Sequence, residues 1–197
     1  MALRKITYYD DPLLRRRSRE VKEITDRVRE LIDDMWETMY ASDGVGLAAP
    51  QVGVLRRIVV IDVSPPPEDE DPDSEAENDL NEESGQNEQD PGQKPEPEII
   101  KYTLINPEIV EVSEEKGSSK EGCLSVPGKY GFVERPTRVV VRALDIEGES
   151  FEIEAEGMLA RALLHELDHL NGVLFTDIAE SIESAEASEA AQEEDSR

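Results

Sequence analysis

The sequence predicts an α+β domain in which antiparallel strands pack around a C-terminal helix, with an amphipathic helix near the N-terminus. Apolar residues recur at helical spacing in two segments, 26–41 and 157–171. Between them lie several runs rich in β-branched residues, which favour strands. The chain shows no internal repeat, so these elements indicate one domain and not an array of similar units.

The N-terminal helix is predicted over 26–41, DRVRELIDDMWETMYA, with Thr25 as its N-cap. We expect SDGVG to end this helix, because Gly44 and Gly46 tolerate backbone angles that other residues resist. The apolar side chains of one helix face are interpreted as core packing. They are Val28, Leu31, Ile32, Met35, Trp36 and Met39.

Strands are predicted in three stretches that follow this helix. The first is RRIVVIDV at 56–63, and the second is IIKYTLINPEIVEVSEE at 99–115. The third, 137–155, is predicted to be a hairpin that turns near Glu147 and Gly148. Hairpins make neighbouring strands antiparallel, which supports the predicted α+β class.

Most of the formal charge of −26 lies in two acidic segments. Residues 64–98 hold 14 Asp and Glu, and residues 179–197 hold 7. Without these two segments the chain has 26 acidic and 19 basic side chains, a net charge of −7. Both segments have almost no large apolar residues that could offset the entropy of ordering. We therefore expect a catalytic domain over 1–178, with a disordered acidic insertion at 64–98 and a disordered tail from 179.

The same composition excludes several classes of partner. Acidic segments cannot neutralise phosphates, so we expect no direct contact with nucleic acid or an anionic membrane. No apolar run approaches the roughly 20 residues of a membrane span. The N-terminus lacks the pattern of a signal peptide, and a single cysteine fits a reducing compartment. A cytoplasmic location is expected.

The final helix, 157–171, carries the chain's only histidines, His165 and His169, in LLHELDHL. A spacing of four residues lets both imidazoles reach one metal ion, with Glu166 beside it. The alternative is a surface helix with two solvated histidines. Leucines on both sides of the motif argue against it, because they predict a buried helix in which uncommitted histidines would be costly. We therefore expect this to be a metal-binding helix.

A catalytic metal site needs a third protein ligand, and the sequence offers Cys123 in KEGCLSVPGKYG. A lone buried cysteine is usually only a small hydrophobic residue. Here it lies in a predicted loop between Gly122 and the turn-forming Pro127 and Gly128. Its thiolate would complete a Cys-His-His set suited to Fe(II), Zn(II), Ni(II) or Co(II).

Three stretches in this order, GVGLAAPQ (44–51), EGCLS (121–125) and HELDH (165–169), resemble the signature motifs of the peptide deformylase family. The resemblance extends to the predicted N-terminal helix and strands. It implies a metal-dependent hydrolase that removes the N-formyl group from the initiator methionine of nascent polypeptides. It also implies one divalent ion, most often Fe(II), bound by Cys123, His165 and His169.

The resemblance assigns roles to the remaining motif residues. Glu166 would be the general acid and base, while the Gln51 amide and the Leu124 backbone N–H would hold the formyl oxygen. Val45 and Gly46 would contact the substrate peptide. The acidic tail stands where the family often has a longer and more basic helix. The chain is therefore expected to meet nascent peptides near the ribosome without docking on it directly.

Two further residues of the final helix lie near the motif. Asp168 does not share the histidine face, so a role beside the metal ligands is favoured over ligation. Arg161 lies one turn before His165, on the face expected to line a pocket. A guanidinium is unexpected in a pocket for methionine, and we expect it to point to solvent while its stem packs.

Two rival functions remain open at this point. One is a different HExxH metallohydrolase or peptidase with another third ligand, which would leave Cys123 and Gln51 without a role. The other is an inactive metal-binding adaptor that uses its acidic segments for interactions. Intact Glu166 and Gln51 argue against the adaptor.

Overall fold

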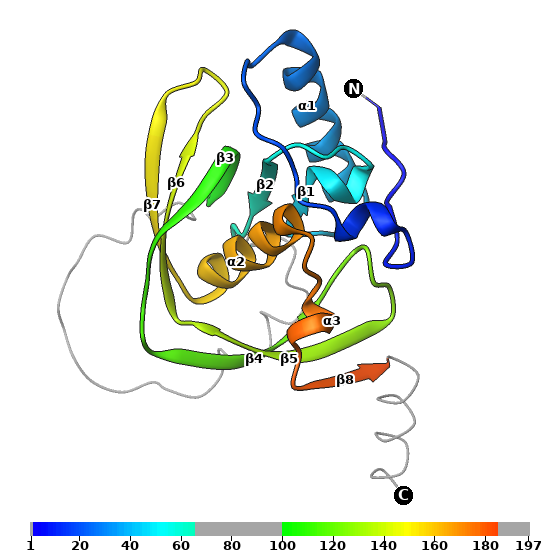
Figure 1. Cartoon of the computed structure of the whole chain (residues 1–197), viewed down its shortest axis with the longest axis vertical. Helices are drawn as coiled ribbons and strands as arrows, with labels where there is room; N and C mark the ends of the chain where they lie inside the picture. The colour runs from blue at the N-terminus through cyan, green and yellow to red at the C-terminus, as the bar shows by residue number, and fades with distance from the viewer. Residues whose placement is uncertain (1, 66–99, 185–197) are drawn as a thin grey trace, which may run out of the picture.

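The molecule is represented by a computed structural model that describes residues 2–65 and 100–184. The α+β class, with antiparallel sheets and a C-terminal helix, is confirmed (Figure 1). The elements are η1 (Pro12–Arg15), α1 (Asp26–Ala41), β1 (Gly46–Ala48), η2 (Ala49–Val52), β2 (Ile58–Asp62), β3 (Lys101–Val112), β4 (Lys116–Gly122), β5 (Lys129–Pro136), β6 (Arg138–Leu144), β7 (Ser150–Glu156), α2 (Gly157–Asn171), α3 (Phe175–Ile178) and β8 (Ser181–Ser184).

Two antiparallel sheets enclose the C-terminal helix. One sheet has the strand order β1-β2-β3-β6-β7, and the other has the order β4-β5-β8. Figure 1 shows α2 between these sheets, with α1 on the far side of β1 and β2. Helix α2 therefore lies next to strands of both sheets, which places a functional group on this helix close to each of them.

Strand β2 has a continuous apolar run, IVVI, because both of its faces are covered. Successive side chains of a strand point to opposite faces. Ile58 and Val60 pack in the cluster that includes α1, and Val59 and Ile61 pack in the cluster that includes α2. Because both faces are covered, none of these four side chains needs to be polar, and all are fully buried.

The expected strand positions agree with the structure to within a few residues. The stretch 56–63 contains β2, and 99–115 contains β3. The predicted hairpin consists of β6 and β7, and its turn includes Gly148 with a φ of 88°. The helix C-terminal to it ends at Gly172, which adopts a left-handed φ of 80° as the predicted C-cap requires.

Strands β4 and β5 were missed by the sequence analysis. Their sequences, KGSSKEG and KYGFVERP, contain glycine, serine and charged residues at most positions, which weakens any strand pattern. They form because they pair with each other, from Lys116 opposite Pro136 to Gly122 opposite Tyr130. The two strands are stabilised by contacts with each other, which the local sequence of either strand does not show.

Two other expectations need correction. The turn after α1 is made by Asp43, with a φ of 52°, and neither Gly44 nor Gly46 has a positive φ. The unstructured tail was expected from Ala179, but Ser181–Ser184 forms β8 on the edge of β5. Edge pairing uses backbone groups, so the four exposed residues of β8 need no apolar side chain. The rest of the predicted tail and nearly all of the predicted insertion lie outside the described residues.

The ends of the predicted insertion lie side by side. Asp62 pairs with Lys101 across the β2–β3 ladder, and the Val63 N–H donates to the Ile100 carbonyl at 3.0 Å. The Ile100 N–H donates in turn to the Ser64 hydroxyl at 2.9 Å. Within the described ranges, no helix is both long and apolar enough to cross a membrane.

We predict that replacing residues 66–96 with a short Gly/Ser turn leaves the fold intact, because the hydrogen bonds between 62–64 and 100–101 already close the hairpin. Each doubling of loop length costs about 0.6 kcal/mol, so shortening should be neutral or stabilising. Thermal unfolding should show a melting temperature equal to the parent's or a few degrees higher. A melting temperature lower by more than about 5 °C would mean that the segment packs against the domain.

Candidate metal centre

Helix α2 buries a polar motif among leucines. Leu163, Leu167 and Leu170 are almost fully buried, and they hold the helix against the five-stranded sheet. The helix ends where it does because Gly172 is left-handed, and a Cβ there would come within 2.6 Å of the Arg15 carbonyl oxygen. Its polar residues are therefore fixed in place by packing around them. Those residues are His165, Glu166 and His169, with exposed fractions of 9%, 4% and 1%.

Cys123 meets the two histidines from another element. It follows Gly122, the last residue of β4, as the chain turns toward β5. Its Sγ lies 3.2 Å from His169 Nε2, and the ligand atoms of Cys123, His165 and His169 all lie within 4.8 Å of one another. Ligands around a tetrahedral ion with bonds of 2.0–2.3 Å are about 3.3–3.6 Å apart. The donor types suit a transition-metal ion, and the Cys123–His169 separation of 3.2 Å is close to the spacing expected around one.

Glu121, which the sequence analysis did not single out, orients the first histidine. Its Oε2 lies 2.9 Å from His165 Nδ1. Burial would raise the pKa of Glu121, but hydrogen bonds from His165 and Arg135 outweigh this and lower it to about 2. An ionised carboxylate only accepts hydrogen bonds, so His165 Nδ1 carries a proton. His165 Nε2 is then left to bind an ion while Nδ1–H donates to a carboxylate, the arrangement found in most histidines that bind metals.

The two histidines differ in their basicity. Burial would lower the pKa of His165, but hydrogen bonds with Cys123 and Glu121 outweigh it and raise the pKa to about 10. The pKa of His169 is lowered well below 6.5, by burial first and then by the charge of His165. His169 thus offers a neutral lone pair, whereas binding of a cation to His165 is coupled to release of a proton.

Glu166 is the buried carboxyl group closest to this centre along the helix. Its Oε2 has no hydrogen-bond partner among the described residues. Burial raises its pKa to about 7, although the charges of His165 and Arg135 act in the opposite direction. A carboxyl group with this pKa can both take and return a proton near neutral pH.

Glycine at position 46 is required by close approach to this carboxyl group. A Cβ at Gly46 would come within 2.6 Å of Glu166 Oε1. At Gly44, a Cβ would lie 2.8 Å from a methyl carbon of Leu124. The sequence analysis attributed these glycines to backbone freedom. In the structure the reason is space, because a side chain at either position would collide with a neighbouring one.

Gln51 is held with its amide nitrogen toward Cys123. Its Oε1 accepts a hydrogen bond from the Ala48 N–H at 2.7 Å, which fixes the orientation of the amide. Its Nε2 then lies 3.6 Å from Cys123 Sγ. The side chain is 1% exposed, so a positioned N–H donor faces the centre.

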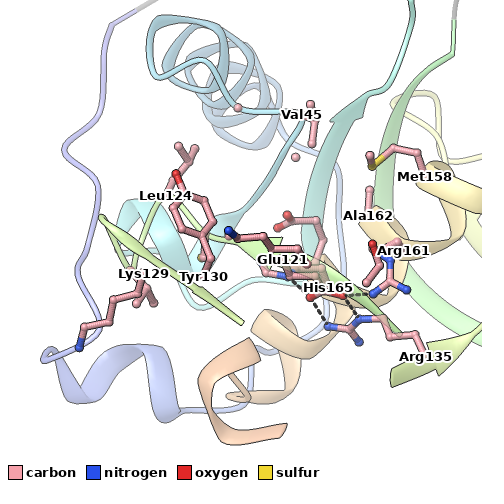
Figure 2. A pocket seen from close by; sticks show the side chains of 18 of the residues that line it. Val45, Glu121, Leu124, Lys129, Tyr130, Arg135, Met158, Arg161, Ala162 and His165 are labelled. Carbon is pink, nitrogen blue, oxygen red and sulfur yellow. Dashed lines mark hydrogen bonds and ion pairs between the residues drawn. The ribbon is translucent and has the colours of Figure 1, made fainter. Parts of the chain in front are cut away.

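A cavity of about 820 Å³ opens beside these residues (Figure 2). The structure thus brings together all the sequence-predicted site residues: Cys123, His165 and His169 form the cluster, and Glu166, Gln51, Leu124, Val45 and Gly46 line the cavity. Asp168 is outside the cluster and accepts a hydrogen bond from Arg135 Nη1 at 2.8 Å.

Arg161 does not point to solvent as expected. Its guanidinium donates to Glu121 Oε1 at 2.7 Å, and its side chain is 17% exposed. The expectation was wrong because the carboxylate partner lies forty residues away in the sequence, on a strand that the sequence analysis missed. The one local signal for this partner is the acidic residue Glu121, which stands two positions before the candidate ligand Cys123.

Comparisons with known proteins agree on one family. A family model described as polypeptide deformylase matches residues 3–185. A peptide deformylase of Clostridium acetobutylicum is 49% identical over 92% of this chain and 98% of its own length. A peptide deformylase of Natranaerobius thermophilus is 43% identical over 92% and 96%.

Solved structures show the same likeness. The crystal structure of a peptide deformylase from Thermotoga maritima has a TM-score of 0.72 at 35% identity and covers 92% of this chain and 100% of that one. A peptide deformylase from Ehrlichia chaffeensis has a TM-score of 0.72 at 40% identity, with coverage of 90% and 88%.

We predict that Cys123→Ala lowers the metal content of the purified protein, because two imidazoles alone bind a divalent ion weakly. Elemental analysis should show the loss, while far-UV circular dichroism stays unchanged since α2 is held by leucine packing. Cys123→Asp should recover part of the metal with altered selectivity, because a carboxylate ligates but is harder than a thiolate. Full metal occupancy in the alanine variant would remove Cys123 from the site.

Proposed function

The chain belongs to the peptide deformylase family, and from that premise we propose which of its residues carry out the reaction. Peptide deformylases are hydrolases that remove the N-formyl group from nascent polypeptides, and this is the function of the chain. The reaction adds water across the formyl C–N bond and yields formate and a free amine. The roles of individual residues, the identity of the metal and the cellular setting are our proposals.

Cys123, His165 and His169 are proposed to hold one divalent ion. A thiolate with two imidazoles suits Fe(II), with Zn(II), Ni(II) and Co(II) as alternatives that the same donors accept. An ion held there would polarise the formyl carbonyl and make water a stronger nucleophile at neutral pH. The support is the convergence of these three donors beside the cavity.

Glu166 is proposed as the general base and then the general acid. It takes a proton from the attacking water and returns it to the nitrogen that leaves. Its pKa of about 7 matches both tasks, and its position against Gly46 puts it where substrate backbone can approach. The unpartnered Oε2 leaves an acceptor free for the water proton.

Gln51 and the backbone N–H of Leu124 are proposed to stabilise the oxyanion that forms when water adds to the formyl carbon. Donors fixed before charge develops lose little energy to reorganisation, and the Ala48 contact fixes Gln51 in this way. Val45 and Gly46 are proposed to contact the substrate backbone at the cavity wall. The Gln51 contact is the observation that carries this proposal, because a metal site without catalysis has no need of an oriented amide.

A peptide deformylase can be separated from the two rival functions by one assay. Formyl-Met peptides should release formate, and the matched unformylated peptides should not be cleaved. A peptidase would cut the unformylated peptides, and an adaptor would turn over neither substrate.

The cellular setting is also a proposal. We place the enzyme in the cytoplasm, where nascent formylated peptides emerge, without direct docking on the ribosome, a membrane or nucleic acid. The support is the acidic composition of the chain. The catalytic domain is proposed to extend through Ser184, because β8 pairs with β5, which lines the cavity.

We predict that Glu166→Gln keeps the metal and loses turnover by about 10²–10⁴-fold, because the amide fits the same space but cannot carry a proton. Formate release and elemental analysis measure the two quantities. Glu147→Gln, in the exposed β6–β7 turn, serves as a control and should behave like the parent. Substantial activity in the Glu166 variant would show that another group is the base.

We predict that Gln51→Glu lowers kcat by about 10²–10³-fold, because the carboxylate still accepts the Ala48 N–H but has no donor for the oxyanion. Metal content should be measured alongside, since a carboxylate could also bind the ion. An unchanged kcat with unchanged metal content would exclude Gln51 as an oxyanion donor.

A further inference from the structure

The guanidinium of Arg161 donates hydrogen bonds to three acceptors in the three-stranded sheet. Its Nη1 donates to Glu121 Oε1 at 2.7 Å and to the Val133 carbonyl at 3.1 Å, and its Nη2 donates to the Gly117 carbonyl at 3.0 Å. These acceptors belong to β4 and β5, whereas Arg161 itself belongs to α2. One side chain therefore ties the histidine helix to both strands of the hairpin that leads to Cys123.

Glu121 receives as many donors as its carboxylate can accept. Arg135 Nε and Arg161 Nη1 lie 2.6 and 2.7 Å from Oε1. Arg135 Nη2 and His165 Nδ1 lie 3.0 and 2.9 Å from Oε2. A carboxylate offers about four acceptor positions, so all are used. Rotation of this group would break several contacts at once, which confines His165 to a single oxygen and a single ring orientation.

The metal ligands come from the same two elements that Arg161 connects. Cys123 lies two residues after Glu121, just beyond the end of β4, and His165 lies four residues after Arg161 on α2. A shift of the hairpin along the helix would change the distance from Cys123 to both histidines. The contacts of Arg161 to the Gly117 and Val133 carbonyls oppose such a shift.

We propose that Arg161 is a positioning residue of the metal centre, acting through Glu121 on His165 and through the β4–β5 hairpin on Cys123. This inference rests on the proposed ligand set. Figure 2 shows Arg161 beside Met158 and Ala162 on the cavity wall, with its guanidinium directed to Glu121. Its charge is matched by a buried carboxylate, so its methylene stem can line a pocket for an uncharged substrate side chain.

The test compares Arg161→Lys, which keeps the charge, with Arg161→Met, which keeps the unbranched stem. The planar guanidinium of Arg161 donates to three acceptors, and the single ammonium of lysine cannot reproduce that geometry. Both variants should therefore raise the dissociation constant for Zn(II) or Co(II), measured by competition with a chelator, by about 10–100-fold. With the metal saturating, kcat should fall and KM should change little, because the stem still lines the cavity.

Two controls isolate the proposed route. Arg142 makes an exposed ion pair with Glu152 at 2.7 Å, and Arg142→Lys and Arg142→Met should leave metal affinity unchanged. The second control is Glu121→Gln with and without Arg161→Lys. Because Arg161 acts on His165 through Glu121, the loss of affinity in the double variant should be smaller than the sum of the two single losses. Fully additive losses would overturn the proposed action of Arg161 through Glu121.

The outcomes also separate this inference from the proposed function. A parent protein that binds no ion at Cys123, His165 and His169 would overturn both. A parent that binds one ion and releases formate, together with Arg161→Lys that binds it as tightly, would overturn only the role of Arg161. Tighter metal binding by Arg161→Met would also overturn only the role of Arg161. It would show that repulsion between its positive charge and the ion is larger than any gain from positioning the ligands. Affinities are compared below each variant's melting temperature, so that lost stability is not read as lost affinity.

Discussion

The geometry of the centre depends on one buried carboxylate. Glu121 accepts hydrogen bonds from Arg135, Arg161 and His165, and it links the end of β4 to α2. An unpaired charge in this interior would cost several kcal/mol, and ion pairs with Arg135 and Arg161 offset that cost for the ionised carboxylate. Ionisation in turn fixes the proton on His165 Nδ1. The orientation of a proposed ligand thus follows from the charge balance among residues that do not themselves bind the ion.

Two of the four buried side-chain atoms that lack a partner among the described residues belong to residues with proposed chemical roles. His169 Nδ1 and Glu166 Oε2 are buried and have no hydrogen-bond partner among the described residues. Burial of an unsatisfied polar atom costs about 1–3 kcal/mol. The leucine packing of α2 and the apolar faces of β2 hold these residues in place despite that cost. A buried carboxyl group that is short of partners keeps a pKa near neutrality, which a solvated glutamate would not have.

The sequence by itself determined the elements whose residues interact locally. Helical spacing and a glycine C-cap place α2 correctly, because a helix depends on contacts three and four residues apart. The apolar run of β2 and the turn of the β6–β7 hairpin are local in the same sense. The His-Glu-His spacing on α2 is also local, so that part of the centre could be predicted directly.

Only the tertiary structure decided how distant segments meet. Strands β4 and β5 have little strand pattern and exist because they pair, which no single stretch reveals. The contacts of Glu121 join residues 14 to 44 positions apart, so neither its burial nor the inward turn of Arg161 follows from the sequence around them. Position 46 has no room for a Cβ because Glu166 lies against it, and this closeness arises only when β1 packs on α2. Local patterns fix elements because their partners are near in the chain, whereas the site forms where packing brings together residues far apart.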